Sequence, residues 1–502
     1  GLVGSEMCIR DRSGYTNPRE SGHDFFTIGH TSTSVSLACG LAKARDLKGG
    51  HENIIAVIGD GSLSGGEAYE GLSNAGEMGT NLIIVVNDNE MSIAENHGGL
   101  YQNLKELRDT EGRSSCNFFR SLGLDYLYVG EGNDIPSLVA AFAKVKDTSR
   151  PTVVHIHTQK GKGYAPAEAD REEFHWEMPF DLETGKPKVD CSGMEDYHSL
   201  TGKFLLEKMK EDHTVVAISS GTPTVIGFTP ERRKQAGRQF VDVGIAEEHA
   251  VALASGIAAG GGRPVYGVYS TFIQRCYDQL SQDLCINGNP AVITVFMGTV
   301  AGMNDVTHLG FFDIPLISNI PNMVYLAPTC SEEYFAMLEW AVRQTEYPVA
   351  IRVPGVAVVH RKEEFDTDYS ELNRYKMTAR GETVAILALG SFYDLGQALK
   401  NKLREESGVE ATLINPRYIT GLDEPMLEEL KVGHRIVVTL EDGVLDGGFG
   451  EKIARYYGNS EMRVLNYGLR KEFADRYNLD ELMKTNRLTD KQMAEDIAGI
   501  LE

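Results

Sequence analysis

Short, continuous apolar runs recur along this chain, and each is followed by a glycine-rich or polar turn. Asn53–Ile58 and Asn81–Val86 are two examples. Runs of roughly five residues without polar interruption are typical of strands buried on both faces, as in parallel sheets. Segments with helical spacing alternate with them, at Thr33–Arg45 and Glu67–Met78. Because parallel neighbours need crossover helices, this alternation predicts doubly wound α/β sheets.

The alternation continues over the rest of the chain. Polar stretches at Asp181–Ser192 and His360–Arg374 interrupt it and read as linkers. We therefore predict three consecutive doubly wound domains, at residues 1–192, 193–358 and 377–502. Gly1–Arg12 fits no periodic pattern. The further predicted strands are Pro151–His157, Val215–Ile218, Pro264–Tyr269, Ala291–Phe296, Met323–Ala327, Thr383–Leu389, Glu410–Asn415, Arg435–Leu440 and Arg463–Tyr467.

Charge and cysteine usage exclude several functional classes. The chain has 49 Lys and Arg against 72 Asp and Glu, a formal charge of −23. Because nucleic-acid binding needs a basic face, we expect no such partner. No apolar run is long enough to span a bilayer, so we expect no membrane partner either. The seven cysteines are scattered without a CxxC pair, which predicts a reducing, cytoplasmic environment with neither disulfides nor zinc.

Two polar motifs directly follow neighbouring apolar runs. The first is Gly59-Asp60-Gly61-Ser62, and the second is Asn87-Asp88-Asn89-Glu90-Met91. Ligands bind at the carboxyl ends of parallel strands, and glycines let the backbone approach a phosphate closely. An Asp and an Asn oxygen suit Mg²⁺ shared with a phosphate. Each motif alone reads as a turn, but the pair at this spacing favours a cofactor site.

The paired motifs resemble the signature of thiamine diphosphate enzymes, and the resemblance extends over nearly the whole chain. The chain is similar to the 1-deoxy-D-xylulose-5-phosphate synthase family, within the transketolase-like group. The motifs that carry this resemblance are Gly29–Ser34, Gly59–Gly61, Asn87–Ile93, Lys160–Tyr164, Asp242–Ala250, Tyr269–Asp278, Thr307–His308 and Glu441–Gly450.

The resemblance implies thiamine diphosphate and Mg²⁺ as cofactors. The metal ligands would be Asp60, Asn89 and the main-chain carbonyl of Met91. Glu247 would hydrogen-bond the aminopyrimidine and activate the cofactor, although Glu248 beside it could be the functional carboxylate and Glu247 only a helix start. The implied cofactor-binding residues are Gly29, His30, Thr31, Gly61, Ser62, Asn89, Tyr164, Glu247, Tyr269 and Phe272.

Substrate contacts follow from the same resemblance. His175 and His308 match substrate histidines, and imidazole suits proton transfer to carbonyl oxygens. Arg275 would attract an anionic acceptor. The implied reaction is decarboxylation of pyruvate, or a similar 2-oxo acid, and condensation of the two-carbon unit with an aldehyde such as glyceraldehyde 3-phosphate. Family behaviour also implies a homodimer. Structural roles stay open for His175 as a surface residue and for Phe272 as a core residue.

Departures from the family pattern keep other functions open. Met297 and Gly355 stand where the family has arginines that hold the acceptor phosphate. Losing both should weaken phosphate binding by about 1.5–3 kcal/mol each, so we expect a different acceptor. The connection from Ile93 to Phe119 is short, and a leading family segment is missing. We expect a longer reading frame or a second polypeptide to supply that segment. The alternatives are a transketolase-like enzyme, a 2-oxo acid dehydrogenase first component, or a non-catalytic paralogue or fragment.

Overall fold

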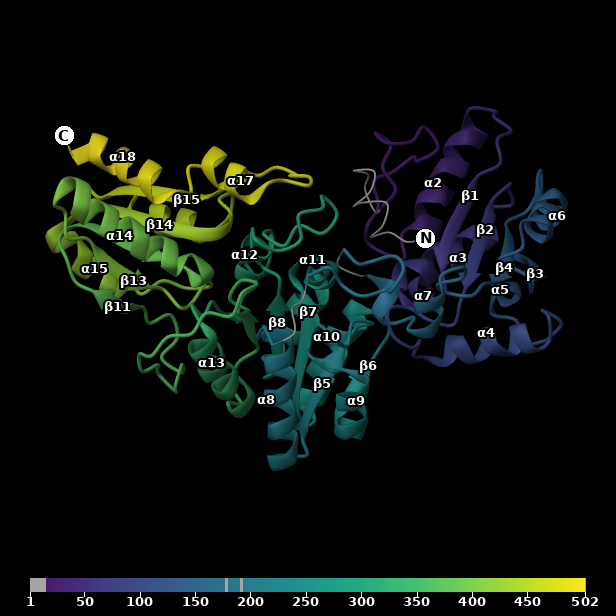
Figure 1. Cartoon of the computed structure of the whole chain (residues 1–502), viewed down its shortest axis with the longest axis horizontal. Helices are drawn as coiled ribbons and strands as arrows, with labels where there is room; N and C mark the ends of the chain where they lie inside the picture. The colour runs from purple at the N-terminus through teal and green to yellow at the C-terminus, as the bar shows by residue number, and fades with distance from the viewer. Residues whose placement is uncertain (1–14, 177–178, 190–192, 502) are drawn as a thin grey trace. The chain divides into compact units, whose positions relative to one another are not determined.

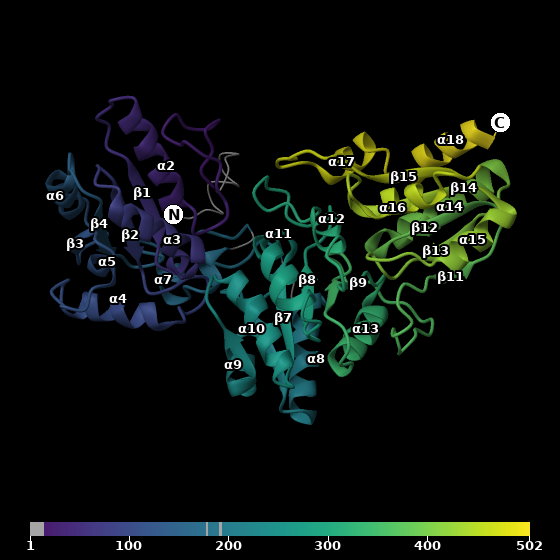
Figure 2. The same ribbon diagram turned by 180° about the vertical axis from the view of Figure 1, so that it is seen from behind.

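The computed structural model describes residues 15–176, 179–189 and 193–501, so the segment Gly1–Arg12 lies outside the described residues. The chain divides into two compact units. One holds the described residues up to Met194, with Ser220–Pro223 and Asp242–Glu247, and the other holds the rest. Figure 1 and Figure 2 show the first unit in purple and blue and the second from teal to yellow.

The first unit is built on a four-stranded parallel sheet. Its strand order is β1-β2-β4-β3, so the chain crosses over between neighbours, as a doubly wound sheet requires. The strands are β1 (Ile55–Gly59), β2 (Ile83–Asp88), β3 (Asp125–Val129) and β4 (Thr152–His157). The helices are α2 (Ser34–Leu47), α3 (Gly66–Glu77), α4 (Gly99–Asp109), α5 (Phe118–Ser121), α6 (Ile135–Val145) and α7 (Ala165–Ala169).

Helices cover both faces of this sheet at β2, whereas Ile55 and Val57 on edge strand β1 are exposed, so the expectation of burial on both faces is wrong for the run Asn53–Ile58. In β2, Ile84 and Val86 join a core with residues of α2, α3 and α4. Ile83 and Val85 point to the opposite face and join a second core with residues of α6. This alternation explains why β2 is continuously apolar in sequence.

The second unit contains two sheets. The first has six strands in the order β6-β5-β7-β8-β10-β9. They are β5 (Val215–Ser219), β6 (Phe240–Asp242), β7 (Arg263–Tyr269), β8 (Val292–Phe296), β9 (Val324–Leu326) and β10 (Val349–Arg352). The helices around it are α8 (Tyr197–Glu211), α9 (Pro230–Ala236), α10 (Glu247–Ala259), α11 (Ser270–Ile273), α12 (Asp313–Ser318) and α13 (Ser331–Arg343).

The other sheet has five strands in the order β11-β13-β12-β14-β15, with β11 antiparallel at its edge. They are β11 (Lys376–Ala379), β12 (Thr383–Ala388), β13 (Thr412–Asn415), β14 (His434–Val444) and β15 (Arg463–Leu469). The helices are α14 (Tyr393–Ser407), α15 (Glu424–Gly433), α16 (Phe449–Tyr457), α17 (Leu479–Thr485) and α18 (Asp490–Leu501). The expected α/β class with parallel sheets is thus confirmed.

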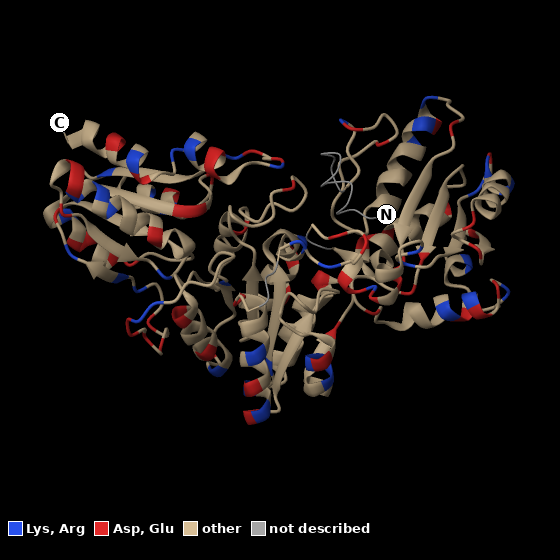
Figure 3. Cartoon of the chain, viewed as in Figure 1, with Lys and Arg blue, Asp and Glu red and all other residues tan. Residues whose placement is uncertain are grey.

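Charged residues of both signs lie on the outer helices (Figure 3). On α4, for example, Lys105 and Asp109 form an exposed ion pair one turn apart. None of the described helices combines the length and apolar character that crossing a bilayer requires. Cys8 and Cys191 lie outside the described residues. The described cysteines are unbridged, and they are Cys39, Cys116, Cys276, Cys285 and Cys330.

Candidate functional site

The two motif turns lie side by side at the carboxyl edge of the first sheet. Asp60 follows β1 and Asn89 follows β2, and these strands pair with Gly59 opposite Asn87. The Asp60 amide donates to the Asn87 carbonyl at 3.0 Å. Two oxygen-rich turns therefore meet where parallel sheets bind ligands.

The Asp60 carboxylate is buried without a cationic side chain among its hydrogen-bond partners in the described structure. Its side chain accepts from Asn96 Nδ2 at 2.7 Å, and the Tyr101 hydroxyl donates to its main-chain oxygen at 3.1 Å. Burial, reinforced by the charge of Asp88, raises the pKa of Asp60 to about 7. A bound cation would favour the ionised form and reverse this shift.

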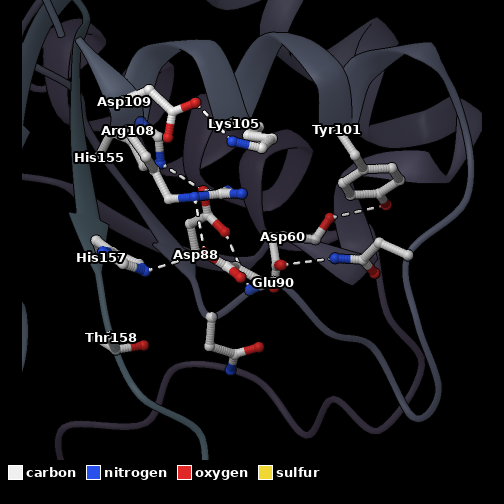
Figure 4. A network of polar contacts seen from close by, with 12 residues as sticks. Asp60, Asp88, Glu90, Tyr101, Lys105, Arg108, Asp109, His155, His157 and Thr158 are labelled. Carbon is white, nitrogen blue, oxygen red and sulfur yellow. Dashed lines mark hydrogen bonds and ion pairs between the residues drawn. The ribbon is translucent and has the colours of Figure 1, made fainter. Parts of the chain in front are cut away.

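Asp88, the neighbouring carboxylate, is fully buried but paired (Figure 4). Its Oδ2 lies 2.5 Å from Arg108 Nη1 and 2.8 Å from His155 Nε2. The other ring nitrogen of His155 lies 2.7 Å from the Tyr126 hydroxyl. Although burial alone would raise it, the His155 hydrogen bond and the Arg108 charge hold the pKa of Asp88 below its usual value. The two carboxylates thus differ, because Asp88 pairs directly with Arg108 and His155, whereas Asp60 has the charge of Lys160 nearby but no ion pair among the described residues.

Two further loops reach the same edge. Ser32, directly after the Gly29-His30-Thr31 segment, donates through Oγ to the Ser62 carbonyl at 2.8 Å. Lys160 Nζ donates to the Ser92 carbonyl at 2.6 Å, and burial lowers the pKa of Lys160 to about 8. The predicted cofactor segments of this unit are therefore tied together by hydrogen bonds.

The donor set at this edge fits a diphosphate with Mg²⁺. A Cβ on Gly61 would lie 2.6 Å from Ser92 Cβ, so only glycine allows this close approach. Two buried polar atoms, Asn96 Oδ1 and Tyr164 Oη, have no hydrogen-bond partner in the described structure. No group of three or more His, Cys, Asp or Glu side chains among the described residues could hold a metal. A metal here would thus take one carboxylate with amide and carbonyl oxygens, a set that suits Mg²⁺.

Asn89 lies in a local turn, whereas His175 lies at the end of a short helix. Asn89 Oδ1 accepts from the Met91 amide at 3.2 Å, so its side chain closes a local turn. His175 ends the short 3₁₀ helix Glu173–His175 and is exposed. Desolvation of its ring, together with the charge of Lys160, nevertheless lowers the pKa of His175 to about 4. No hydrogen bond or ion pair among the described residues joins His175 to Asp60.

A second cluster of predicted residues lies in the other unit. The ring of Phe272 lies 5.7 Å from that of Tyr269 and 5.6 Å from that of His308. Tyr269 also meets His198 edge-to-face at 6.1 Å. Three predicted residues, two from the end of β7 and α11 and one from a later loop, therefore share one aromatic cluster.

Hydrogen bonds set the proton position on His308. The Thr307 hydroxyl donates to Asp305 Oδ1 at 2.5 Å and lies 2.8 Å from His308 Nδ1. Because that hydroxyl proton is used on Asp305, Nδ1 donates to Thr307 and the lone pair of neutral His308 is on Nε2. Burial lowers the pKa of His308, which favours this neutral form.

The remaining predicted residues lie at four separate positions in the chain. Glu247 is the first residue of α10 and is only 3% exposed. Arg275 is half-buried in a 3₁₀ turn after α11. Met297 follows β8 with a positive φ of 56° and packs against the hydrophobic core, while Gly355 has φ of 69°. Neither of the last two offers a charged group to an anion.

Three residues at the Asp60 edge were not predicted as site residues. Asn96 and Tyr101 contact Asp60, and Arg108 contacts Asp88. Asn96 closely follows the Asn87–Ile93 motif, and this proximity in sequence could have indicated that it belongs to the site. Tyr101 and Arg108 lie on α4, whose packing position has no sequence signature.

Family comparisons agree with the motifs. Residues 9–116 match the 1-deoxy-D-xylulose-5-phosphate synthase family model. Residues 195–358 match the transketolase pyrimidine-binding domain, and residues 374–493 match the transketolase C-terminal domain.

Individual relatives carry the same name. The chain is 36% identical over 518 residues to 1-deoxy-D-xylulose-5-phosphate synthase of Clostridium beijerinckii, covering 95% of this chain and 82% of that protein. It is 36% identical over 507 residues to 1-deoxy-D-xylulose-5-phosphate synthase 1 of Geobacter sulfurreducens, covering 92% and 78%.

Among solved structures, similar chains are transketolases. A split-gene transketolase in an inactive β4 tetramer matches with a TM-score of 0.51 and 21% identity, over 61% of this chain and 98% of that one. Transketolase of Pichia stipitis in complex with sedoheptulose 7-phosphate matches with a TM-score of 0.50 and 15% identity, over 93% and 79%. At these identities the similarity establishes the fold.

Proposed function

Because the chain belongs to the 1-deoxy-D-xylulose-5-phosphate synthase family, we propose that it decarboxylates pyruvate and condenses the two-carbon unit with an aldehyde. It is a thiamine diphosphate-dependent transferase with a transketolase-like fold. The observation that carries the proposal is Asp60, a buried carboxylate that forms no ion pair among the described residues, at the edge where the family motifs converge.

The proposed cofactor residues fall into two groups, one for the diphosphate with its metal and one for the aminopyrimidine. At the first sheet, Asp60, Asn89 and the Met91 carbonyl would hold Mg²⁺, once the Asn89 side chain leaves its local turn. The loop residues Gly29, His30, Thr31, Gly61 and Ser62 would bind the diphosphate, and the partnerless hydroxyl of Tyr164 would donate to it. Glu247, Tyr269 and Phe272 would bind the aminopyrimidine.

Bound thiamine diphosphate supplies a nucleophilic carbon that takes up the two-carbon unit of the 2-oxo acid. The chain's own groups position substrates and move protons. Glu247, which is buried, would share a proton with the aminopyrimidine through its Oε. His308 Nε2 would accept a proton from a substrate hydroxyl and return it.

Substrate binding would complete these roles. Arg275 would attract the acceptor's negative charge, and His175 would contact the substrate. Because Met297 packs in the core and Gly355 has no side chain, the acceptor pocket would hold a phosphate weakly, which favours a less charged aldehyde.

Assembly and location are proposed from the family and from cysteine usage. We expect a homodimer, which light scattering would record as twice the 55.2 kDa chain mass. We expect a cytoplasmic enzyme, since the described cysteines are unbridged. Cell fractionation would check this.

Calorimetry of thiamine diphosphate binding tests the proposal. We expect saturable binding that requires Mg²⁺ and is lost in Asp60→Asn, which keeps the side-chain shape but removes the only proposed anionic ligand. Lys105→Ala, on the exposed face of α4, is the matched control and should bind normally. A folded wild-type chain that binds no cofactor would refute the proposal.

A further inference from the structure

The loop between the proposed ligands Asn89 and Met91 has an unfavourable backbone conformation. Glu90 has φ of 68°, in the left-handed region that non-glycine residues rarely adopt. Such a conformation persists only when surrounding contacts hold it. The contacts of Glu90 and of its neighbour Asp88 should therefore reveal what fixes the loop.

Both carboxylates that flank Asn89 contact one side chain, that of Arg108 (Figure 4). Arg108 Nη1 lies 2.5 Å from Asp88 Oδ2, and Arg108 Nε lies 3.1 Å from Glu90 Oε1. The Glu90 amide also donates to Asp88 Oδ1 at 3.2 Å. The Arg108 side chain is only 13% exposed and that of Asp88 is fully buried, so solvent screens the contact between these two little. One residue thus bridges the two sides of the proposed metal ligand.

Two histidines of strand β4 also contact the carboxylates of this loop. His155 Nε2 on β4 lies 2.8 Å from Asp88, and His157 Nε2 lies 3.4 Å from Glu90 Oε1. Asp88 therefore has two partners, Arg108 and the buried His155, whereas Glu90 is half exposed and lies nearer to Arg108 than to His157. Removing Arg108 should loosen the loop and still leave Asp88 paired with His155.

Helix α4 brings Arg108 to this loop and reaches Asp60 at the same time. Tyr101 and Arg108 are seven residues apart, two helical turns, and so share one face of the helix. Tyr101 donates to the Asp60 carbonyl, and Arg108 pairs with Asp88. Buried Leu104 and Leu107 fix the helix against the core. One helix thus contacts both metal-binding turns.

We infer that Arg108 is a positioning residue for the metal site, fixing the backbone of the Asp88–Glu90 loop next to the proposed ligands Asn89 and Met91. This inference rests on the proposed function. Arg108 does not touch the metal, and the exposed Lys105–Asp109 pair on the same helix takes no part. Partners one shell away from a metal typically change its affinity roughly 10- to 100-fold when removed.

The test is a Mg²⁺ titration by calorimetry at saturating thiamine diphosphate, on wild type, Arg108→Ala, Arg108→Lys and Lys105→Ala. We expect Arg108→Ala to weaken Mg²⁺ binding at least tenfold, with kcat at saturating Mg²⁺ within about threefold of wild type. Arg108→Lys should recover part of the affinity, because an ammonium can pair with Asp88 but cannot bridge both carboxylates. Lys105→Ala should match wild type.

Glu90→Ala supplies a second variant in case Arg108→Ala folds poorly, because Glu90 is half exposed. It should also weaken Mg²⁺ binding, by a smaller factor. Wild-type affinity in both Arg108→Ala and Glu90→Ala would overturn the inference alone. An equal loss of Mg²⁺ affinity in Lys105→Ala would also overturn the inference. A wild-type chain that takes up no Mg²⁺ would instead overturn the proposed function.

Discussion

At the scale of single residues, Asp60 destabilises the metal-free fold when it ionises. Its pKa is raised to about 7 by burial and by Asp88, above the value of 3.8 that an exposed Asp has. The folded state therefore favours the protonated form. The contribution of Asp60 to the free energy of unfolding is full below about pH 4. It falls as the pH rises from about 4 to 7 and is lost above that range.

Replacing Asp60 by Asn should remove this pH dependence. In metal-free protein at pH 8, we expect Asp60→Asn to be more stable than wild type by about 2–4 kcal/mol, measured by urea unfolding. At pH 4 the two should differ little. Mg²⁺ with thiamine diphosphate should stabilise only the wild type. Parallel stability curves for the two proteins between pH 4 and 8 would contradict the burial argument.

Residue roles were predictable to different extents. Asp60 and Asn89 could be proposed because each directly follows an apolar run, and strand ends have a sequence signature. Glu247 and His308 needed the family resemblance. Arg108 could not be predicted, because it lies 20 residues from Asp88 in sequence and its role depends on where α4 packs. The buried contact of His155 with Asp88 likewise depends on the packing of β4 beside β2 and has no local sequence signal.

At the scale of elements, most strands were predicted within one to three residues, because central parallel strands are apolar throughout. Four were missed. Two have clear reasons: β3 is a partly exposed edge strand with Asp and Tyr, and β11 is an antiparallel edge strand. These two edge strands lack the continuous apolar run by which the other strands were recognised. The other two missed strands, β6 and β10, are short.

Replacing either of two glycines in neighbouring helices by alanine should change the stability of the protein in opposite directions. In α3, a Cβ on Gly76 would lie 1.9 Å from the Leu122 carbonyl oxygen, so the helix can pack there only with glycine. We expect Gly76→Ala to destabilise the protein by about 1–3 kcal/mol. In α2, a Cβ on Gly40 would meet nothing within 4 Å.

Gly40→Ala is therefore the matched control. It should stabilise by about 0.5–1 kcal/mol, because alanine is the better helix former. Thermal unfolding of both variants checks the pair. A loss of stability in Gly40→Ala as large as that in Gly76→Ala would show that close packing is not the reason.

At the scale of the whole molecule, three sheets were expected and three are present. The boundaries 1–192, 193–358 and 377–502 stay a prediction, because the last two blocks share one compact unit. A buried network links their sheets: Arg352 at the end of β10 pairs with Asp313 at 2.7 Å and donates to the Asp442 carbonyl on β14 at 2.6 Å. Such a contact joins residues 90 apart, and no local pattern signals it.

The central claim is that this chain transfers a two-carbon unit from a 2-oxo acid to an aldehyde. The direct measurement is mass spectrometry of the products formed from uniformly ¹³C-labelled pyruvate, with thiamine diphosphate and Mg²⁺ present. The acceptor is either glyceraldehyde or glyceraldehyde 3-phosphate. We predict labelled CO₂ and a labelled acyloin in equal amounts, with turnover at least 100-fold lower in Glu247→Gln. If the wild-type chain binds its cofactor yet forms neither product, or if Glu247→Gln retains full turnover, the account is wrong.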